Sequence, residues 1–346
     1  MAGQHGTPTT RRTTRRWTTS AVPDLTGRVA VVTGGNGGLG LETSKVLAAA
    51  GAHVVMAARN AQKAAGAASA IRTASPHASV EIVPLNLADL SSVREAADTI
   101  SDRHAAVDLL INNAGLMAMP RSVTTDGFET QLGVNHLGHW ALTARLLRPL
   151  LRADAARVVS VTSTAHHMGR SIDPGDPHLE QSYSAWSAYG RSKLANYHFG
   201  IGLQRLFQQS GVAAQSLLAH PGLSDTGLME TSVAGGDSGV FGKALRAAAP
   251  RIGMPAASGA LPQLRAATDP HAQGGDFYGP MFVNNGSPTK RPVLRRIGLD
   301  TSISRLWDLS TRLTGLPIDV DTIHEAATRS LRAADGPVPP GTDPAA

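Results

Sequence analysis

The chain has 346 residues, of which 42% are hydrophobic, 4% are aromatic and none is cysteine. This hydrophobic content can fill a sizeable globular core, and because no run of about eighteen apolar residues is present, no membrane-spanning segment is expected. The absence of cysteine excludes disulfides, thiolate catalysis and cysteine-held zinc, and no metal centre is predicted.

The net charge is +6, but it is concentrated only near the N-terminus. Four arginines lie there among Thr, Gly and Pro, so residues 1–24 are predicted to be a disordered basic tail: Arg11, Arg12, Arg15 and Arg16. No apolar segment follows Arg16, so an export signal is not expected and we predict a cytoplasmic protein with no specific nucleic-acid partner. Binding of nucleic acid or an anionic surface by the tail stays open as an alternative.

Residues 25–332 are expected to form one domain, followed by a loose tail rich in Pro and Gly over 333–346. Short β-rich runs alternate there with longer helical patterns, which is typical of a doubly wound parallel sheet. The expected strands are Val29–Val32, His53–Ala57, Val80–Val83, Leu109–Asn112, Arg157–Thr162, Ala213–Leu218 and Phe277–Val283. Right-handed crossovers predict a single Rossmann-type α/β sheet of seven strands in the order 3-2-1-4-5-6-7, with helices on both faces and the ligand crevice at the carboxyl edge.

Two helices carry clear local signals. Ser92 with Glu95 forms a capping-box pattern before the apolar residues of Val93–Ile100. The segment Gln131–Leu151 carries an apolar stripe at helical spacing, and it is therefore expected to be helical.

A glycine-rich loop joins the first expected strand to a helix. Its sequence is Thr33-Gly34-Gly35-Asn36-Gly37-Gly38-Leu39-Gly40, and the helix continues to Ala50. Such a loop lets backbone amides approach a pyrophosphate, and the helix N-terminus adds partial positive charge. The pattern favours a bound dinucleotide over a plain tight turn.

Arg59 ends the second expected strand, where a dinucleotide with a free ribose 2′-hydroxyl usually meets an acidic side chain. The local sequence Ala57-Ala58-Arg59-Asn60 offers no acid. Because an arginine can pair with a 2′-phosphate, NADP(H) is favoured and NAD(H) remains possible. The alternative is an ordinary exposed arginine.

Tyr189 and Lys193 are one helical turn apart and should share a helix face. A tyrosine ordinarily titrates near pH 10, and a neighbouring cation lowers its pKa by favouring the phenolate. The pair is therefore a candidate general acid or base, although the same spacing also occurs on solvated helix faces.

Together these motifs resemble the short-chain dehydrogenase/reductase family. The loop from Thr33 to Gly40, Asn112-Asn113-Ala114-Gly115 and Tyr189-x-x-x-Lys193 match its motifs in order and spacing. The resemblance implies a catalytic set of Asn135, Ser163, Tyr189 and Lys193. It implies cofactor contacts from Thr33, Gly34, Asn36, Gly37, Gly38, Leu39, Gly40, Arg59, Asn60, Asn86, Leu87, Asn113, Ala114, Gly115, Tyr189, Lys193, Pro221, Gly222 and Thr226.

Within that family the chain is similar to the branch of retinol dehydrogenases, WW-domain oxidoreductases and protochlorophyllide reductases. The run Asn135-His136-Leu137-Gly138-His139 and Leu306-Trp307 carry this likeness. Protochlorophyllide reductases use cysteines near their pigment, so the absence of cysteine disfavours the light-driven enzyme. Asn86 stands where the family usually has an aspartate beside the adenine, and its carbonyl could still accept a bond there.

The resemblance implies hydride transfer between nicotinamide and a carbonyl or alcohol. Tyr189 would donate a proton in reduction, Ser163 would hold the substrate oxygen, and Lys193 would lower the tyrosine pKa and grip the nicotinamide ribose. Asn135 would hold a water that links Lys193 to solvent. From the residues alone, Ser163 could instead be a buried, satisfied hydroxyl, and Asn135 a helix kink or cap.

The substrate is less defined. Residues 223–253 contain apolar side chains among glycines, which suits a substrate lid or, equally, a surface helix pair. A lid would favour a lipophilic aldehyde, ketone or alcohol, with His166, His167 and Met168 lining the pocket. A homo-oligomer is possible, since the family pairs helices corresponding to 131–151 and 187–207. The alternative functions are a non-catalytic dinucleotide-binding redox sensor and a nucleic-acid-associated protein.

Overall fold

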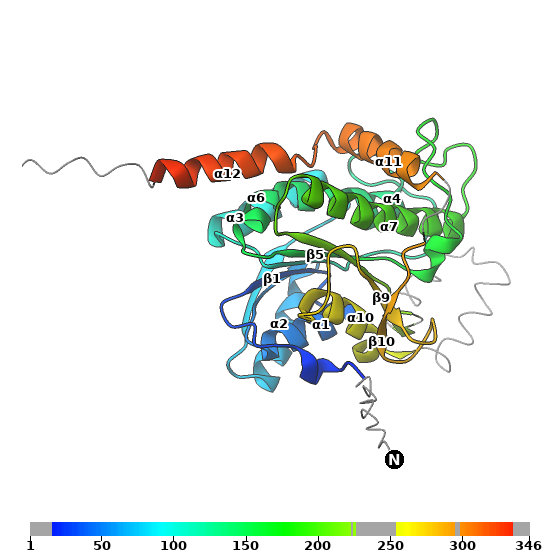
Figure 1. Cartoon of the computed structure of the whole chain (residues 1–346). Coiled ribbons are helices and arrows are strands. Elements are labelled where there is room, and N and C mark those ends of the chain that lie inside the picture. The colour runs from blue at the N-terminus through cyan, green and yellow to red at the C-terminus, as the bar shows by residue number, and fades with distance from the viewer. Residues whose placement is uncertain (1–15, 223, 226–253, 295–297, 335–346) are drawn as a thin grey trace, which may run out of the picture.

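The computed structural model describes residues 16–222, 224–225, 254–294 and 298–334, and they are built around an eight-stranded sheet (Figure 1). Its strands are β1 (Val29–Thr33), β2 (His53–Ala58), β3 (Ser79–Pro84), β4 (Leu109–Asn112), β5 (Arg157–Val161), β6 (Gln215–Ala219), β9 (Phe277–Pro280) and β10 (Pro288–Arg291). The spatial order is β10-β9-β6-β5-β4-β1-β2-β3. The predicted seven-strand order 3-2-1-4-5-6-7 is confirmed, with β9 as the seventh strand.

The eighth strand, β10, pairs antiparallel with β9 at the edge of the sheet and is absent from the sequence prediction. Its sequence, Pro-Thr-Lys-Arg, has neither alternation nor β-branched enrichment, and a proline is tolerated only because the strand is at an edge. The expected strand Phe277–Val283 ends at Pro280, because the chain turns there and Val283 adopts a positive φ of 63°.

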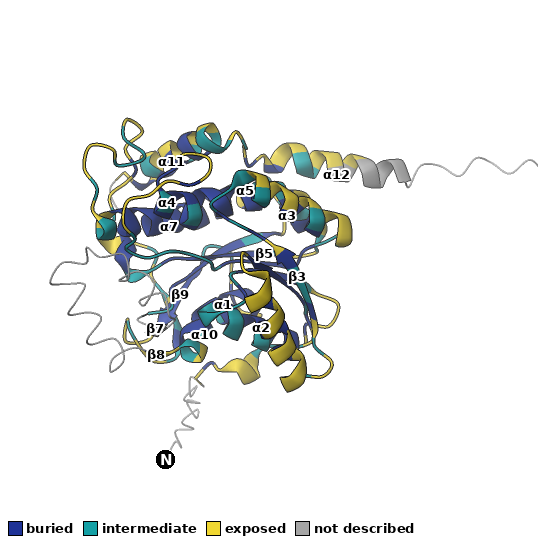
Figure 2. Cartoon of the chain, turned by 180° about the vertical axis from the view of Figure 1, so that it is seen from behind, coloured by how far each residue is buried: buried dark blue, intermediate teal, exposed yellow. Residues whose placement is uncertain are grey.

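Helices cover both faces of the sheet (Figure 1). One face carries α1 (Gly38–Ala49), α2 (Ala61–Ala74) and α10 (Ala256–Thr268); the other carries α3 (Leu90–Arg103), α4 (Thr130–Leu132), α5 (Gly138–Arg145), α6 (Leu147–Arg152) and α7 (Ala185–Gln209). Outside α7 lies α11 (Leu299–Thr314), and α12 (Val320–Ala334) projects from the body. Successive strand residues face opposite layers: Val31 joins the core under α7, and Val32 joins the core under α1. Figure 2 shows the buried strands between more exposed outer helix faces.

The start of α3 differs from the predicted capping box. Asp89 is the N-cap, and its side chain accepts bonds from the backbone amides of Ser91 and Ser92. The Ser92 hydroxyl instead accepts from the Asn86 amide at 3.0 Å. Asp is as good a cap as Ser, so the acidic residue three positions earlier takes the role and leaves Ser92 to hold the loop after β3.

The expected helical segment Gln131–Leu151 is broken into several pieces. Between α4 and α5, residues Gly133–Leu137 form a π-helical turn, and α6 follows α5 with a further break at Leu146. Gly138 allows this turn to sit against the loop after β3, because a Cβ atom there would lie 2.6 Å from the Leu87 carbonyl oxygen. Asn135 thus occupies a π turn, a feature that frequently marks functional sites.

Described structure is present before residue 25, within the predicted tail. Trp17 is buried, and Thr19–Ala21 form a short 3₁₀ helix, η1, within the predicted tail. Arg11, Arg12, Arg15 and the end of the C-terminal tail lie outside the described residues. Of the predicted lid, only Ser224 and Asp225 are described; they form β7, which pairs with β8 (Met254–Pro255). Among the described helices, none is long and apolar enough to cross a membrane.

Candidate active site

The glycine loop has the tight conformation that its sequence predicts. Gly34 and Gly38 have positive φ values of 67° and 50°, which glycine adopts without strain. A Cβ atom on Gly40 would lie only 2.3 Å from the Gly34 carbonyl oxygen, so only glycine lets α1 begin so close to the loop. The loop and the N-terminus of α1 together form a cradle that suits a pyrophosphate.

Thr33 and Asn113 tie the glycine loop to the chain that follows β4. The Thr33 hydroxyl accepts bonds from the backbone amides of Asn113 at 2.9 Å and Ala114 at 3.0 Å. The Asn113 side-chain amide donates to the Thr33 carbonyl at 2.8 Å, and its oxygen accepts from Gln263 at 3.1 Å. The two predicted cofactor motifs are therefore one hydrogen-bonded unit, and Gln263 on α10 is a supporting residue that sequence reasoning missed.

Tyr189, Lys193 and Ser163 come together beside this unit. The Ser163 hydroxyl is near enough to lower the pKa of the Tyr189 hydroxyl, and the Lys193 ammonium lies 5.9 Å from the centre of the tyrosine ring. Ser163 also caps the short helix η3 (Thr164–His167) by accepting from the Ala165 amide at 3.2 Å. Lys193 donates to the Val161 carbonyl at the end of β5 at 3.2 Å. The predicted catalytic trio thus shares one site at the carboxyl ends of the strands.

Burial controls the ionisation of this pair. It raises the pKa of Tyr189 above its ordinary value, and the neighbouring Ser163 hydroxyl only partly offsets that rise. Burial also lowers the pKa of Lys193 to about 8. The expectation that Lys193 lowers the tyrosine pKa is therefore not met here, because desolvation outweighs it and the side chain that lowers the tyrosine pKa is Ser163. Tyr189 is consequently a protonated donor at neutral pH.

Asn135 is fully buried and directs its whole side chain into protein contacts. Its oxygen accepts from the Leu116 amide at 2.7 Å, and its amide donates to the Leu116 carbonyl at 2.9 Å and to the Ser192 hydroxyl at 2.8 Å. A Cβ atom on Gly115 would lie 3.0 Å from the Asn135 oxygen and 3.3 Å from the Lys193 ammonium. The absence of a side chain on Gly115 therefore leaves room for both Asn135 and Lys193 beside this residue.

His139 is a site residue that sequence reasoning missed. Its Nδ1 lies 3.0 Å from the Asn135 carbonyl oxygen, and its Nε2 lies 2.9 Å from the Thr33 hydroxyl. Burial lowers the pKa of His139 to about 4, so the ring is neutral. The carbonyl can only accept, so Nδ1 carries the proton and Nε2 accepts from Thr33. A lone histidine on a helix gives little sequence signal. Its spacing of four residues from Asn135, however, could have predicted that the two residues share a helix face.

The end of β2 supplies a positive surface beside the glycine loop. Arg59 is exposed there, and Asn60 caps α2 by accepting from the Lys63 amide at 2.8 Å. A Cβ atom on Gly37 would lie 3.1 Å from the Lys63 ammonium, so this second cation sits against the loop. Lys63 was missed, although a lysine in the first turn of a helix runs against the usual acidic preference and could have been noticed.

Of the remaining residues predicted to contact the cofactor, all but Thr226 lie within the described part of the chain. The Asn86 oxygen accepts from the Ala88 amide at 3.2 Å, so one of its two acceptor directions is already used. Leu87 packs its backbone against Gly138. Gly222 has a positive φ of 69° and donates its amide to His220 at 3.2 Å after Pro221, whereas Thr226 lies outside the described residues.

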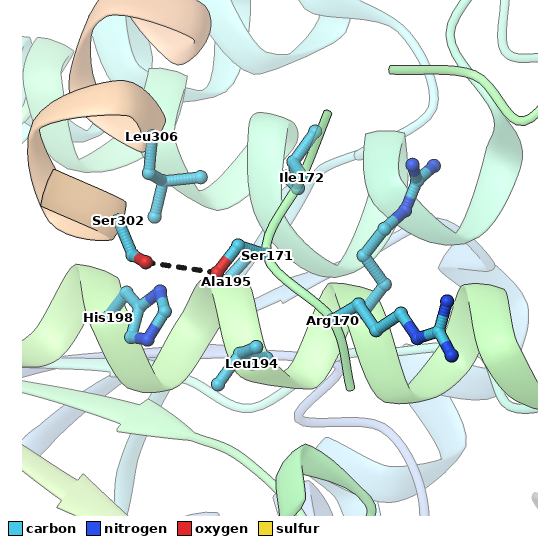
Figure 3. Close-up of a pocket in the computed structure, with 9 residues that line it drawn as sticks. Arg170, Ser171, Ile172, Leu194, Ala195, His198, Ser302 and Leu306 are labelled. Atoms are coloured by element: carbon cyan, nitrogen blue, oxygen red, sulfur yellow. Dashed lines mark hydrogen bonds between the residues drawn. The ribbon is translucent and has the colours of Figure 1, made fainter. Parts of the chain in front are cut away.

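A separate small cavity lies on the other side of α7 (Figure 3). It is lined by Arg191 and His198 of α7, by Leu306 of α11 and by Ile172 of the chain between η3 and α7. Ser171 and Ser302 are joined there by a 3.0 Å hydrogen bond. Because these α7 positions are about half a helical turn from Tyr189 and Lys193, the cavity opens away from the tyrosine. It is not part of the candidate active site.

Comparison with known proteins agrees with this geometry. A family model described as short chain dehydrogenase matches residues 28–235. The chain belongs to the short-chain dehydrogenase family. The resemblance inferred from its motifs is thereby confirmed.

The family members that it matches include retinol dehydrogenases. It is 37% identical over 297 residues to retinol dehydrogenase 11 of Homo sapiens, covering 85% of this chain and 88% of that protein. It is 44% identical over 208 residues to retinol dehydrogenase 12 of Homo sapiens, covering 60% of this chain and 65% of that relative, just under two thirds of its length. A solved structure from Mycobacterium paratuberculosis has a TM-score of 0.72 and 38% identity, covering 88% of this chain and 100% of that one. The chain thus lies in the retinol dehydrogenase-like branch of the family.

Proposed function

We propose that this chain is an NADP(H)-dependent oxidoreductase that interconverts a carbonyl and an alcohol, with Tyr189 as the general acid or base. The observation that carries the proposal is the grouping of three side chains: the buried Tyr189, Ser163, whose hydroxyl lowers the pKa of Tyr189, and Lys193, whose ammonium lies 5.9 Å from the centre of the tyrosine ring. The trio adjoins the cradle formed by the glycine loop. The nicotinamide, when bound, supplies or accepts the hydride.

The residues of the site divide the remaining work. The Ser163 hydroxyl can hold the substrate oxygen, since it lies near enough to Tyr189 to lower the pKa of that side chain. Tyr189 then donates its proton to that oxygen in the reductive direction and accepts it in the oxidative direction. Burial raises the pKa of Tyr189, which keeps the proton available for reduction at neutral pH.

Lys193 and Asn135 support the proton route. Lys193, whose pKa burial lowers to about 8, can give up a proton near neutral pH more readily than an exposed lysine can. Asn135 is held by Leu116 and Ser192, and Ser192 in turn donates to the Tyr189 carbonyl at 2.8 Å. We propose that these contacts fix the backbone around a water that resupplies the proton.

The choice of NADP(H) rests on the cations beside the loop. Arg59 and Lys63 flank the glycine loop, and no acid occupies the end of β2. A 2′-phosphate would meet two positive charges there, whereas a free 2′-hydroxyl would lack its usual carboxylate.

The substrate is proposed to be a lipophilic alcohol, aldehyde or ketone. Met168 follows η3 and is 66% exposed, so an apolar side chain is exposed five residues after Ser163. The relatives named retinol dehydrogenases support the same substrate class. A cytoplasmic location remains a proposal from the sequence.

Tyr189→Phe tests the proposal. The variant should bind NADPH like the parent yet reduce a panel of lipophilic aldehydes about 10²–10⁴ times more slowly, because it lacks the acidic hydroxyl. Tyr278→Phe is the matched control: its hydroxyl bonds to Asp276 at 3.0 Å, outside the Ser163 and Lys193 site, so turnover should persist. Turnover of Tyr189→Phe at the parental rate would overturn the proposed mechanism. If the parent binds NADPH but reduces none of the panel, the redox-sensor alternative is favoured.

A further inference from the structure

His53, Glu81 and His104 converge at the edge of the sheet opposite the glycine loop. His53 begins β2, Glu81 lies in the first half of β3, and His104 follows the last residue of α3. The glycine loop and Arg59 leave the carboxyl ends of β1 and β2, so this cluster is at the other end of the strands. It plays no part in the proposed reaction.

Both imidazoles present the same ring nitrogen to the same carboxylate oxygen. His53 Nε2 lies 3.2 Å from Glu81 Oε2, and His104 Nε2 lies 3.0 Å from that atom. The ring centres are 5.0 Å apart, and the three ligand atoms all lie within 4.8 Å of one another. Within the part of the chain that the structure describes, this is the one group of three His, Asp or Glu side chains that converges in this way.

Neighbouring side chains hold the cluster in place. The Ser79 hydroxyl lies 2.7 Å from His53 Nδ1 and so orients the ring, as outer contacts do for metal-bound histidines. Arg103 pairs with the other carboxylate oxygen of Glu81, Oε1, and leaves Oε2 to the histidines. The side chains of His53, His104 and Glu81 are 32%, 13% and 17% exposed, which leaves a route for an ion from solvent.

We propose that His53, Glu81 and His104 form a binding site for a zinc-class divalent transition metal ion. Two imidazole nitrogens and one carboxylate oxygen are a ligand set that suits Zn²⁺, with water in the fourth position. Bonds of about 2.0–2.2 Å in a tetrahedral site place ligand atoms roughly 3.3 Å apart. The two separations from the histidine nitrogens to Glu81 Oε2, 3.2 and 3.0 Å, are close to this value, and the two nitrogens lie within 4.8 Å of each other. The ion would join β2, β3 and the end of α3.

Arg103 gives the proposal its distinguishing test. Its guanidinium neutralises part of the Glu81 charge, so it should weaken the binding of a cation. A metal site therefore predicts opposite effects for two neighbours: His104→Gln weakens Zn²⁺ binding, and Arg103→Gln strengthens it. If the cluster is only a hydrogen-bonded carboxylate, neither change alters Zn²⁺ binding.

Isothermal titration of the full chain with Zn²⁺ alone, in a non-chelating buffer, measures these effects. The parent should bind one ion, His104→Gln about 10–100 times more weakly, and Arg103→Gln more tightly than the parent. His77→Gln removes an exposed histidine near β3 that is not in the cluster, and its affinity should match the parent. Equal affinity in the parent and His104→Gln, or an equal loss in His77→Gln, would overturn the site.

Thermal unfolding provides a second measurement that does not use activity. Zn²⁺ should raise the Tm of the parent and of His77→Gln, because an ion bound only by the folded state stabilises it. Zn²⁺ should leave the Tm of His104→Gln unchanged. Circular dichroism checks that each variant is folded, and a parental Zn²⁺ response in His104→Gln would count against the proposal.

Discussion

The Nδ1 atom of His139 lies 3.0 Å from the carbonyl oxygen of Asn135, within the π turn that interrupts the helix. The other ring nitrogen lies 2.9 Å from the hydroxyl of Thr33, which in turn accepts the backbone amides of Asn113 and Ala114. One neutral ring therefore links Asn135, which the sequence predicts to be catalytic, to the base of the glycine-loop cradle. Because both of its ring nitrogens contact protein atoms, we expect His139 to act as a positioning residue.

Substitutions at His139 can separate its two bonds. In His139→Asn the side-chain amide falls near the position of Nδ1 and can still donate to Asn135, whereas in His139→Gln the longer side chain can reach Thr33 instead. His139→Leu loses both bonds and should lower the free energy of unfolding by about 1–3 kcal/mol, because buried partners are left unsatisfied. Urea unfolding measures this loss.

The kinetic readout distinguishes positioning from simple stability. We expect His139→Asn to retain more of the parental kcat than His139→Gln, since it keeps the bond to Asn135. His139→Gln should retain the tighter NADPH binding of the two. If both variants lose kcat and NADPH affinity in the same proportion, the two bonds have no separate roles.

The sequence predicted the parts of this site that local chemistry determines. The glycine loop and the pair Tyr189 and Lys193 could be placed because a strand, a tight turn and a helical spacing leave clear local patterns. The π turn at Asn135 could not be predicted, because it depends on Gly138 meeting the Leu87 carbonyl, a contact between segments far apart in the chain. Likewise, β10 becomes a strand only because β9 offers it an open edge.

Cofactor preference should depend on Arg59 and Lys63. Arg59→Asp should weaken NADPH binding by about 10–100-fold, the loss expected for a hydrogen bond to a charged group, and should narrow or reverse the preference over NADH. Lys63→Ala should have a smaller effect of the same sign. Lys45→Ala is the control for Lys63→Ala, because it also removes one positive charge, at a surface position where the lysine pairs with Glu42 at 2.7 Å. An unchanged preference in Arg59→Asp would contradict the NADP assignment.

The buried histidines should make the protein sensitive to acid. Burial lowers the pKa of His136 from 6.5 to about 3, with smaller contributions from the neighbouring His139 and His198. Between these values the unfolded chain binds one more proton at this position than the folded chain, so stability is lost as the pH falls below about 6.5. From pH 7 to pH 5 this one group should lower the free energy of unfolding by about 2 kcal/mol.

His136→Gln isolates that contribution. The glutamine can still reach the Ser310 hydroxyl, which lies 2.9 Å from His136 Nε2, but it does not titrate. The difference in unfolding free energy between pH 7 and pH 5, measured with urea, should therefore be about 2 kcal/mol smaller in the variant. An identical pH dependence in the two proteins would show that His136 is not kept neutral by burial.

The helix α11 should stabilise the molecule and block one route to a dimer. Trp307 packs 4.9 Å from the ring centre of Trp140 and 5.8 Å from that of Phe199, and a Cβ atom on Gly202 would lie 2.3 Å from the Trp307 ring. Thus α11 covers the outer face of α7, one of the helices that family members use for pairing. Trp307→Ala should lower the free energy of unfolding by about 3 kcal/mol.

Analytical ultracentrifugation tests whether the contact between α11 and α7 prevents self-association. With α11 in place the face of α7 is not available to a second copy, so we expect the parent to show no association through it, and Trp307→Ala to associate more strongly because apolar surface is uncovered. Arg205→Ala, which removes only the ion pair between Arg205 and Asp300 of α11 at 2.7 Å, should behave like the parent, since exposed pairs contribute little. A parental dimer that cross-links through α7 would contradict the covering role of α11.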